Sequence, residues 1–225
     1  MTWDDVRTSI VEACHRLEAE NLVHGSSGNV SVRLPKADDG TELFAMTPSG
    51  VPYRVLRPAQ VLIVDAEANV VDGDGVGKPS SERKVHFAAY RERPDVHAVI
   101  HSHSIYASAL AAAGQDLPAI IDEMVVCIGG PVQCAPYGMP ATQLLADTAI
   151  ELMGLRQAVL LRNHGVVGVG RDLEEALTVV DMVERTAQIY LLARLMGEVQ
   201  PIPDNVAQIE VKFFRMQHGL PAEDP

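Results

Sequence analysis

The sequence predicts a single mixed α/β or α+β domain over residues 1–225. Three observations predict it. A chain of 225 residues, 47% of them hydrophobic, can bury one sizeable core. Segments with helical spacing of apolar residues are interspersed with short β-branched segments, and no linker or internal repeat divides the chain. Since only 4% of the residues are aromatic, Val, Leu, Ile and Ala must fill most of the core.

The first elements follow from apolar spacing and from turn residues. Apolar residues recur at helical spacing over 4–20, which predicts an amphipathic helix. A Gly/Ser turn then leads into residues 29–34, whose alternation of apolar and polar residues predicts a half-buried strand. Two further strands are expected at 42–46 and 61–64, with a Pro-Ser-Gly turn between them.

The next stretch combines a loop and a helix. Residues 70–79 are rich in Gly and Asp and are expected to form a loop. Ser80 or Ser81 can cap a helix that runs to Arg93, where Pro94 stops it.

The remaining chain repeats the alternation of strands and helices. Strands are expected over 96–103, 120–128, 132–135, 158–161 and 166–169. Helices are expected over 104–113, 142–153, 172–195 and 204–216, the last two beginning at Asp residues.

Charge and composition exclude several classes of partner. The formal net charge of −12 argues against nucleic acid and against a polybasic membrane surface. No apolar run reaches the ~18–20 residues of a membrane span, and the charged first 20 residues do not resemble a signal peptide. Three scattered cysteines without a CxxC pair favour reduced thiols, so we expect a cytoplasmic protein.

The motif His101-Ser102-His103 is the sharpest local feature. In a strand, His101 and His103 point to the same face, where two imidazoles suit a borderline metal such as Zn²⁺. Two hydrogen-bonded histidines at a strand end are the structural alternative. His164, in a polar Asn-His-Gly triplet between two apolar segments, could complete a three-histidine site or simply stabilise a turn.

Glu82 is the candidate acid/base residue. It stands at the start of a predicted helix, where the helix dipole favours a carboxylate whether or not the residue has a further role. Near a divalent cation it could bind the metal or transfer protons. His86, four residues later, shares its helical face and is interpreted as a supporting residue rather than a ligand.

Three small-residue segments could bind an anion through backbone N–H groups and short polar side chains. Each is also a common kind of turn, and none is a Walker or dinucleotide motif. The segments are Gly28-Asn29, Ser49-Gly50 and Ser80-Ser81.

Asp122, Glu123 and His218 are further acid/base candidates. Asp122 and Glu123 form an acidic pair that a solvated turn would also explain. His218 follows the last predicted helix, where a cation would complement the helix dipole.

Six motifs in order make the sequence resemble the class II aldolase/adducin family, closest to its L-fuculose-1-phosphate aldolase branch. The resemblance covers nearly the whole chain. The motifs are GNVSVR from Gly28, TPSGVPY from Thr47, PSSERKVHFAAYRERP from Pro79, HSHS from His101, CAPY from Cys134 and NHG from Asn163.

The resemblance implies a fold and a set of site residues. It implies a three-layer αβα sandwich with a mixed, largely antiparallel central sheet, assembled as a homotetramer with active sites between subunits. It implies one Zn²⁺ per subunit, replaceable by Co²⁺ or Mn²⁺. The implied metal ligands are Glu82, His101, His103 and His164, and Glu82 would also move protons at the nucleophilic carbon. The implied phosphate-binding residues are Gly28, Asn29, Ser49, Gly50, Ser80 and Ser81.

The reaction implied is reversible cleavage of a ketose 1-phosphate to dihydroxyacetone phosphate and an aldehyde. This chain departs from the family pattern on the aldehyde side. The family's tyrosine after the Pro-Ala-Ile segment is absent, its C-terminal tyrosine aligns with His218, and a family phenylalanine is Pro140. The identity of the aldehyde product is therefore not determined by the sequence. A 5-deoxypentulose or methylthiopentulose 1-phosphate is as consistent with the sequence as fuculose 1-phosphate.

Two alternatives remain at this point. A sugar-phosphate 4-epimerase, decarboxylase or dehydratase of the same family would keep much of the site, although epimerases carry Asp where this chain has Glu82. A non-catalytic, adducin-like binding module would lose the metal ligands, all four of which are present.

Overall fold

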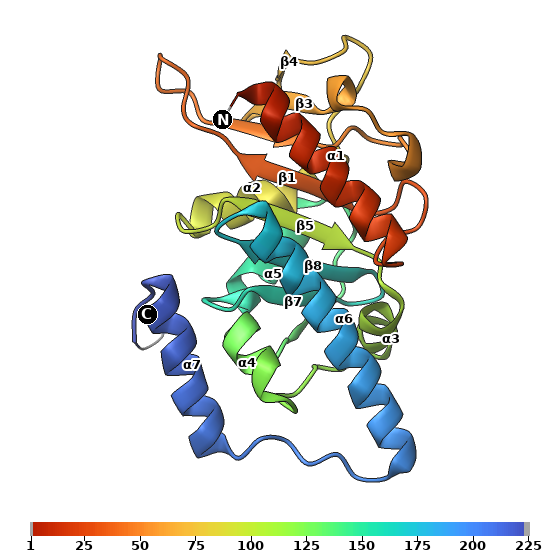
Figure 1. The fold of residues 1–225 in the computed structure, drawn as a ribbon, viewed down its shortest axis with the longest axis vertical. Coiled ribbons are helices and arrows are strands. Elements are labelled where there is room, and N and C mark those ends of the chain that lie inside the picture. Colours follow the sequence, from red (N-terminus) through yellow and green to blue (C-terminus); the bar gives the residue numbers. More distant parts are fainter. Residues whose placement is uncertain (1, 223–225) are drawn as a thin grey trace.

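A computed structural model describes residues 2–222 and contains one eight-stranded sheet with helices on both faces (Figure 1). The strand order is β4-β3-β2-β1-β5-β8-β7-β6, and every neighbouring pair is antiparallel except β6 with β7. The strands are β1 (Asn29–Arg33), β2 (Leu43–Met46), β3 (Leu62–Asp65), β4 (Val70–Asp72), β5 (Ala98–Ser102), β6 (Cys134–Ala135), β7 (Ala158–Leu161) and β8 (Gly165–Gly170). The expected mixed, largely antiparallel sheet is confirmed.

The described residues form seven α-helices, of which α7 packs against α4. They are α1 (Trp3–Ala19), α2 (Arg83–Glu92), α3 (Ile105–Ala113), α4 (Asp122–Ile128), α5 (Gln143–Met153), α6 (Leu173–Met196) and α7 (Asp204–His218). Within residues 2–222, none of them combines the length and apolar composition that a membrane span requires.

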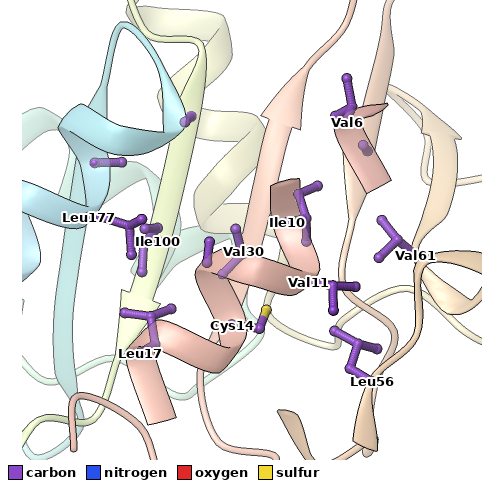
Figure 2. Close-up of a cluster of buried hydrophobic side chains, with 14 of the residues drawn as sticks. Val6, Ile10, Val11, Cys14, Leu17, Val30, Leu56, Val61, Ile100 and Leu177 are labelled. Carbon is purple, nitrogen blue, oxygen red and sulfur yellow. The ribbon is translucent and has the colours of Figure 1, made fainter. Parts of the chain in front are cut away.

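The layers follow from the alternation of side chains along the central strands. Val30 of β1 and Ile100 of β5 face α1 and α6, where they pack with Ile10, Cys14 and Leu177 (Figure 2). The opposite face of the sheet packs against α2 and α5 in a second apolar cluster. The three-layer αβα sandwich is therefore confirmed, with β1 and β5 buried in its middle.

The predicted strand over 120–128 is wrong, because most of this segment is helix α4. A short apolar run does not reveal its period, so strand and helix could not be separated from sequence. In the structure Met124, Val125 and Ile128 are buried on one side of the helix, while Val126 is exposed. Asp122 lies in the first turn, where the helix dipole favours it.

Three smaller differences concern element boundaries. The expected loop over 70–79 contains the edge strand β4, whose two valines are exposed. Helix α2 begins at Arg83 with Glu82 as its N-cap residue, so neither serine is the cap; the Ser80 hydroxyl instead accepts a hydrogen bond from the Glu82 N–H. Strand β5 ends at Ser102, which leaves His103 in the turn that follows.

Candidate active site

Four side chains predicted as metal ligands converge at one end of the central strands. Glu82 is the N-cap residue of α2, His101 lies in β5, His103 follows β5, and His164 lies in the turn between β7 and β8. One ligand atom from each residue lies within 4.8 Å of every other. The pairing of β5 with β8 brings together His101 and His164, which are 63 residues apart in the chain.

The distances among these atoms are those of a cation site. His101 Nε2 lies 2.9 Å from His103 Nε2 and 3.3 Å from His164 Nε2. The two Glu82 carboxylate oxygens lie 3.2 Å from His101 Nε2 and 3.2 Å from His164 Nε2. Lone-pair-bearing atoms at such separations repel one another unless a positive charge lies between them, so this donor set fits a divalent cation.

The protonation states agree with that interpretation. His101 Nδ1 lies 3.0 Å from the Val166 carbonyl, which only accepts, so Nδ1 carries a proton and Nε2 is the ligand atom. Burial lowers the pKa of His103 to about 4, assisted by the neighbouring imidazoles, and it also lowers the pKa of His164. Burial raises the pKa of Glu82, but contact with His101 and the other imidazoles outweighs burial and lowers that pKa to about 2. At neutral pH Glu82, His103 and His164 are in the deprotonated form that a metal requires.

Glycine at position 165 lets β8 approach β5 closely beside the ligands. A Cβ atom on Gly165 would lie 2.3 Å from the Ser102 carbonyl oxygen and 3.1 Å from the His103 ring. In this turn the positive φ of 59° belongs to Asn163, so Gly165 is not needed for a left-handed backbone. Gly165 therefore serves close packing next to the site.

Backbone contacts hold the three predicted phosphate-binding segments together. The Val30 N–H donates to Thr47 Oγ1 at 3.1 Å, which joins the segment at Gly28 to the 47–50 turn. Pro48 forms an isolated bridge with Pro79, and the Ser49 N–H donates to the Lys78 carbonyl at 2.8 Å. The 47–50 turn therefore lies beside both other segments. Since the Ser49 N–H is already used, its hydroxyl is the donor left for a ligand.

Gly28 connects these segments to the metal ligands. Its φ is +78°, and a Cβ atom there would lie 2.5 Å from the His101 carbonyl oxygen. The next residue, Asn29, stands directly opposite His101 in the β1–β5 pairing, so the two side chains share one face of the sheet.

The structure does not bring the three aldehyde-side candidates to this cluster within one chain. Glu123 forms an exposed ion pair with Arg185 at 3.4 Å. Asp122 faces Glu210 of α7 and, after burial, is the cause that raises the pKa of Glu210. His218 is held by Glu175 of α6, with 3.0 Å between Nε2 and Oε1.

A buried polar network beside the cluster was only partly anticipated. His86 Nε2 contacts Asn29 Oδ1, and its Nδ1 lies 2.6 Å from Ser31 Oγ. Ser31 Oγ lies 2.7 Å from Tyr90 Oη. The sequence contains a signal for it: Glu82, His86 and Tyr90 recur every four residues in a helix, and polar residues alternate along β1.

These features define an α/β protein with a donor set that fits a divalent cation next to three glycine- and serine-rich segments. A profile of the Class II Aldolase and Adducin N-terminal domain matches residues 8–191. The chain therefore belongs to the class II aldolase and adducin family.

Individual relatives match over nearly their whole lengths. The 5-deoxy-D-ribulose 1-phosphate aldolase of Bacillus thuringiensis serovar kurstaki is 36% identical over 92% of this chain and 94% of that protein. The L-fuculose phosphate aldolase of Escherichia coli K12 is 32% identical over 100% of both chains. A solved L-fuculose 1-phosphate aldolase superposes with a TM-score of 0.85 at 34% identity, covering 94% of this chain and 96% of that one.

Proposed function

We propose that this protein is a metal-dependent aldolase that cleaves a ketose 1-phosphate reversibly to dihydroxyacetone phosphate and an aldehyde. The convergence of Glu82 and three histidines beside the Gly28–Asn29 segment carries the proposal. Relatives that match this chain over more than nine-tenths of its length are named aldolases for ketose 1-phosphates.

Glu82, His101, His103 and His164 would hold the metal through one carboxylate and three Nε2 atoms. When bound, a divalent cation supplies Lewis-acid polarisation of the C2 carbonyl and the neighbouring hydroxyl of the sugar. We infer zinc because three imidazoles with one carboxylate are ligands that zinc prefers. Elemental analysis of freshly purified protein tests the metal: one zinc per chain supports the inference, and another metal or none contradicts it.

Glu82 is the residue we propose for proton transfer at C3 of the sugar. Its side chain is 17% exposed, so a substrate can reach it, and its low pKa keeps it ionised as a base. In the synthesis direction it removes a proton from C3 of dihydroxyacetone phosphate, and in cleavage it returns that proton to C3 of the leaving fragment.

The phosphate would be bound by Gly28, Asn29, Ser49, Gly50, Ser80 and Ser81. Backbone contacts among these segments support the assignment, because they gather short polar side chains and backbone N–H groups beside the cluster. A net charge of −12 therefore does not oppose binding of one phosphate ester.

The proton on the aldehyde side would come from outside the four-ligand cluster. Asp122, Glu123 and His218 remain the candidates, and each would have to act from a neighbouring subunit. We therefore propose a homotetramer with active sites between subunits, supported by exposed apolar side chains such as Leu195, Met196 and Phe213 on α6 and α7. Sedimentation equilibrium tests it: a monomer would contradict the assembly. Three free cysteines support a cytoplasmic location.

A substrate panel with and without a chelator tests the function. The panel contains L-fuculose 1-phosphate, 5-deoxyribulose 1-phosphate and 5-methylthioribulose 1-phosphate, and the readout is dihydroxyacetone phosphate. We expect release from at least one of them, lost with chelator and restored by zinc. L-Ribulose 5-phosphate is the comparison arm: its isomerisation without cleavage of any panel member would overturn the aldolase in favour of an epimerase.

A further inference from the structure

Polar side chains of α2 and β1 face each other in the interior of the sandwich. Asn29 and Ser31 of β1 meet His86 and Tyr90 of α2, and all four are at least 97% buried. Buried polar groups are costly unless each has a partner, so the partners are expected to be specific.

The partners form one continuous chain of hydrogen bonds. Tyr90 Oη lies 2.7 Å from Ser31 Oγ, which lies 2.6 Å from His86 Nδ1. His86 Nε2 in turn contacts Asn29 Oδ1. This series of hydrogen bonds therefore begins in the apolar cluster, where Tyr90 stacks on Phe44 with 4.8 Å between ring centroids. It ends at the predicted phosphate site.

The hydrogen bonds of this series all donate in one direction that the residue chemistry determines. Asn29 Oδ1 can only accept, so His86 Nε2 carries the proton and donates it. Burial lowers the pKa of His86 to about 3, so the ring is neutral and Nδ1 must accept. The Ser31 hydroxyl then donates to Nδ1, and the Tyr90 hydroxyl donates to Ser31.

This direction determines which end of the Asn29 amide is free. The oxygen is held by His86, and Nδ2 forms no hydrogen bond to another residue of the described chain. Asn29 lies opposite His101 and directly after Gly28, so the free N–H groups belong to the site rather than to the core. Without His86, the amide could rotate and present its oxygen to an anionic substrate.

We propose that His86 is a positioning residue that holds the Asn29 amide with Nδ2 turned toward the phosphorylated substrate, where it donates a hydrogen bond. This proposal rests on the proposed function in one respect, the assignment of Asn29 to the substrate site. His86 does not touch substrate and acts through Asn29.

Two substitutions of His86 separate its donor from its bulk. His86→Phe fills the space but cannot donate to Asn29, whereas His86→Gln keeps an amide N–H near the position of Nε2. With zinc-loaded protein and dihydroxyacetone phosphate in isothermal titration calorimetry, we expect H86F to weaken binding about 10-fold or more and H86Q to stay within about threefold of wild type. Phe44→Leu, which disturbs the same core beside Tyr90, serves as the control and should lower Tm without weakening binding.

A double-mutant cycle tests whether His86 acts through Asn29. In an Asn29→Ala background, H86F should cost no further affinity, because the amide that it positions is gone. An undiminished H86F effect in that background, or equal weakening by H86F and H86Q, would overturn the proposal. If H86F fails to fold, Ser31→Ala replaces it, because it removes the hydroxyl that donates to His86 Nδ1. Ser31→Ala should weaken binding in wild-type protein and should have no further effect in the Asn29→Ala background.

A substrate-free measurement separates this proposal from the proposed function. Two-dimensional ¹H–¹⁵N NMR of the imidazole nitrogens should show His86 as the neutral Nε2–H tautomer, unchanged between pH 8 and pH 5. The Nδ1–H tautomer would overturn the positioning role even if the enzyme is an active aldolase. Wild-type protein that binds no dihydroxyacetone phosphate would overturn both the proposed function and this role.

Discussion

The charged side chains of the Glu82 cluster and those of the α4–α7 side of the molecule differ in burial and in how they are paired. Around Glu82 and the three histidines, polar groups are largely buried and partnered by one another. On the α4–α7 side, Glu123 forms an exposed ion pair with Arg185. The first region gathers four side chains that can bind a metal at one point, whereas the charged groups of the α4–α7 side are paired at separate points, as in the contact of His218 with Glu175.

The largest effect is expected at Glu82. Glu82→Gln keeps the shape of the side chain but removes the carboxylate that we propose as metal ligand and proton carrier, so kcat should fall about 100- to 10,000-fold. Steady-state rates at saturating zinc, with circular dichroism as the check of folding, measure it. Glu174→Gln is the matched control, because this exposed carboxylate pairs with Arg16 and has no proposed catalytic role. An equal loss of kcat there would show that the effect is not specific to the Glu82 cluster.

Gly28 should show the next largest effect, on stability. Gly28→Ala combines a positive φ with a Cβ atom 2.5 Å from the His101 carbonyl oxygen, so the free energy of unfolding should fall by about 2–4 kcal/mol. Gly25→Ala shares a positive φ but meets nothing within 4 Å, so it should cost only about 1–2 kcal/mol. Urea denaturation measures both. Equal losses would mean that close packing against β5 contributes nothing.

His86 makes the buried network sensitive to acid. Its pKa is about 3 in the folded protein against 6.5 for an ordinary histidine. Between these two pH values the unfolded chain therefore binds a proton at His86 and the folded chain does not. Its contribution to stability is therefore complete above pH 6.5 and is lost as the pH falls toward 3, at up to about 1.4 kcal/mol per pH unit. In metal-free protein, His86→Gln should flatten the fall in Tm between pH 6 and pH 4. A fall as steep as that of wild type would contradict the burial of a neutral His86.

The smallest effects are expected on the α4–α7 side. Arg185→Ala removes only an exposed ion-pair partner of Glu123, so the free energy of unfolding should change by less than about 0.5 kcal/mol. Thermal denaturation at low and moderate salt measures it. A loss of several kcal/mol would show that this surface is buried, as an interface between subunits would make it.

The sequence predicted the sheet and the four side chains that converge beside it, because both depend on local information. The alternation along β1 and β5 gives the face of each side chain, and the histidine spacing and Asn-His-Gly turn mark His101, His103 and His164. Helix α4 was missed because its apolar run is too short to reveal a period.

The long-range partners could not be predicted from the sequence. Ser31 lies 55 residues from His86 and 59 from Tyr90, and His218 lies 43 residues from Glu175. Such pairs exist only once β1 has packed on α2 and α7 on α6. The residue types and spacings nevertheless showed that α2 carries a polar face, and that face is where the unpredicted network lies.

Proton exchange into dihydroxyacetone phosphate tests the proposed role of Glu82 and the metal, because it needs no knowledge of the aldehyde. In D₂O with zinc, wild-type protein should exchange one C3 hydrogen of dihydroxyacetone phosphate for deuterium, as read by NMR. Exchange should stop in Glu82→Gln and with chelator, and it should persist in Glu123→Gln and in His218→Asn. No exchange by zinc-loaded wild type, or equal exchange by Glu82→Gln, would contradict the account.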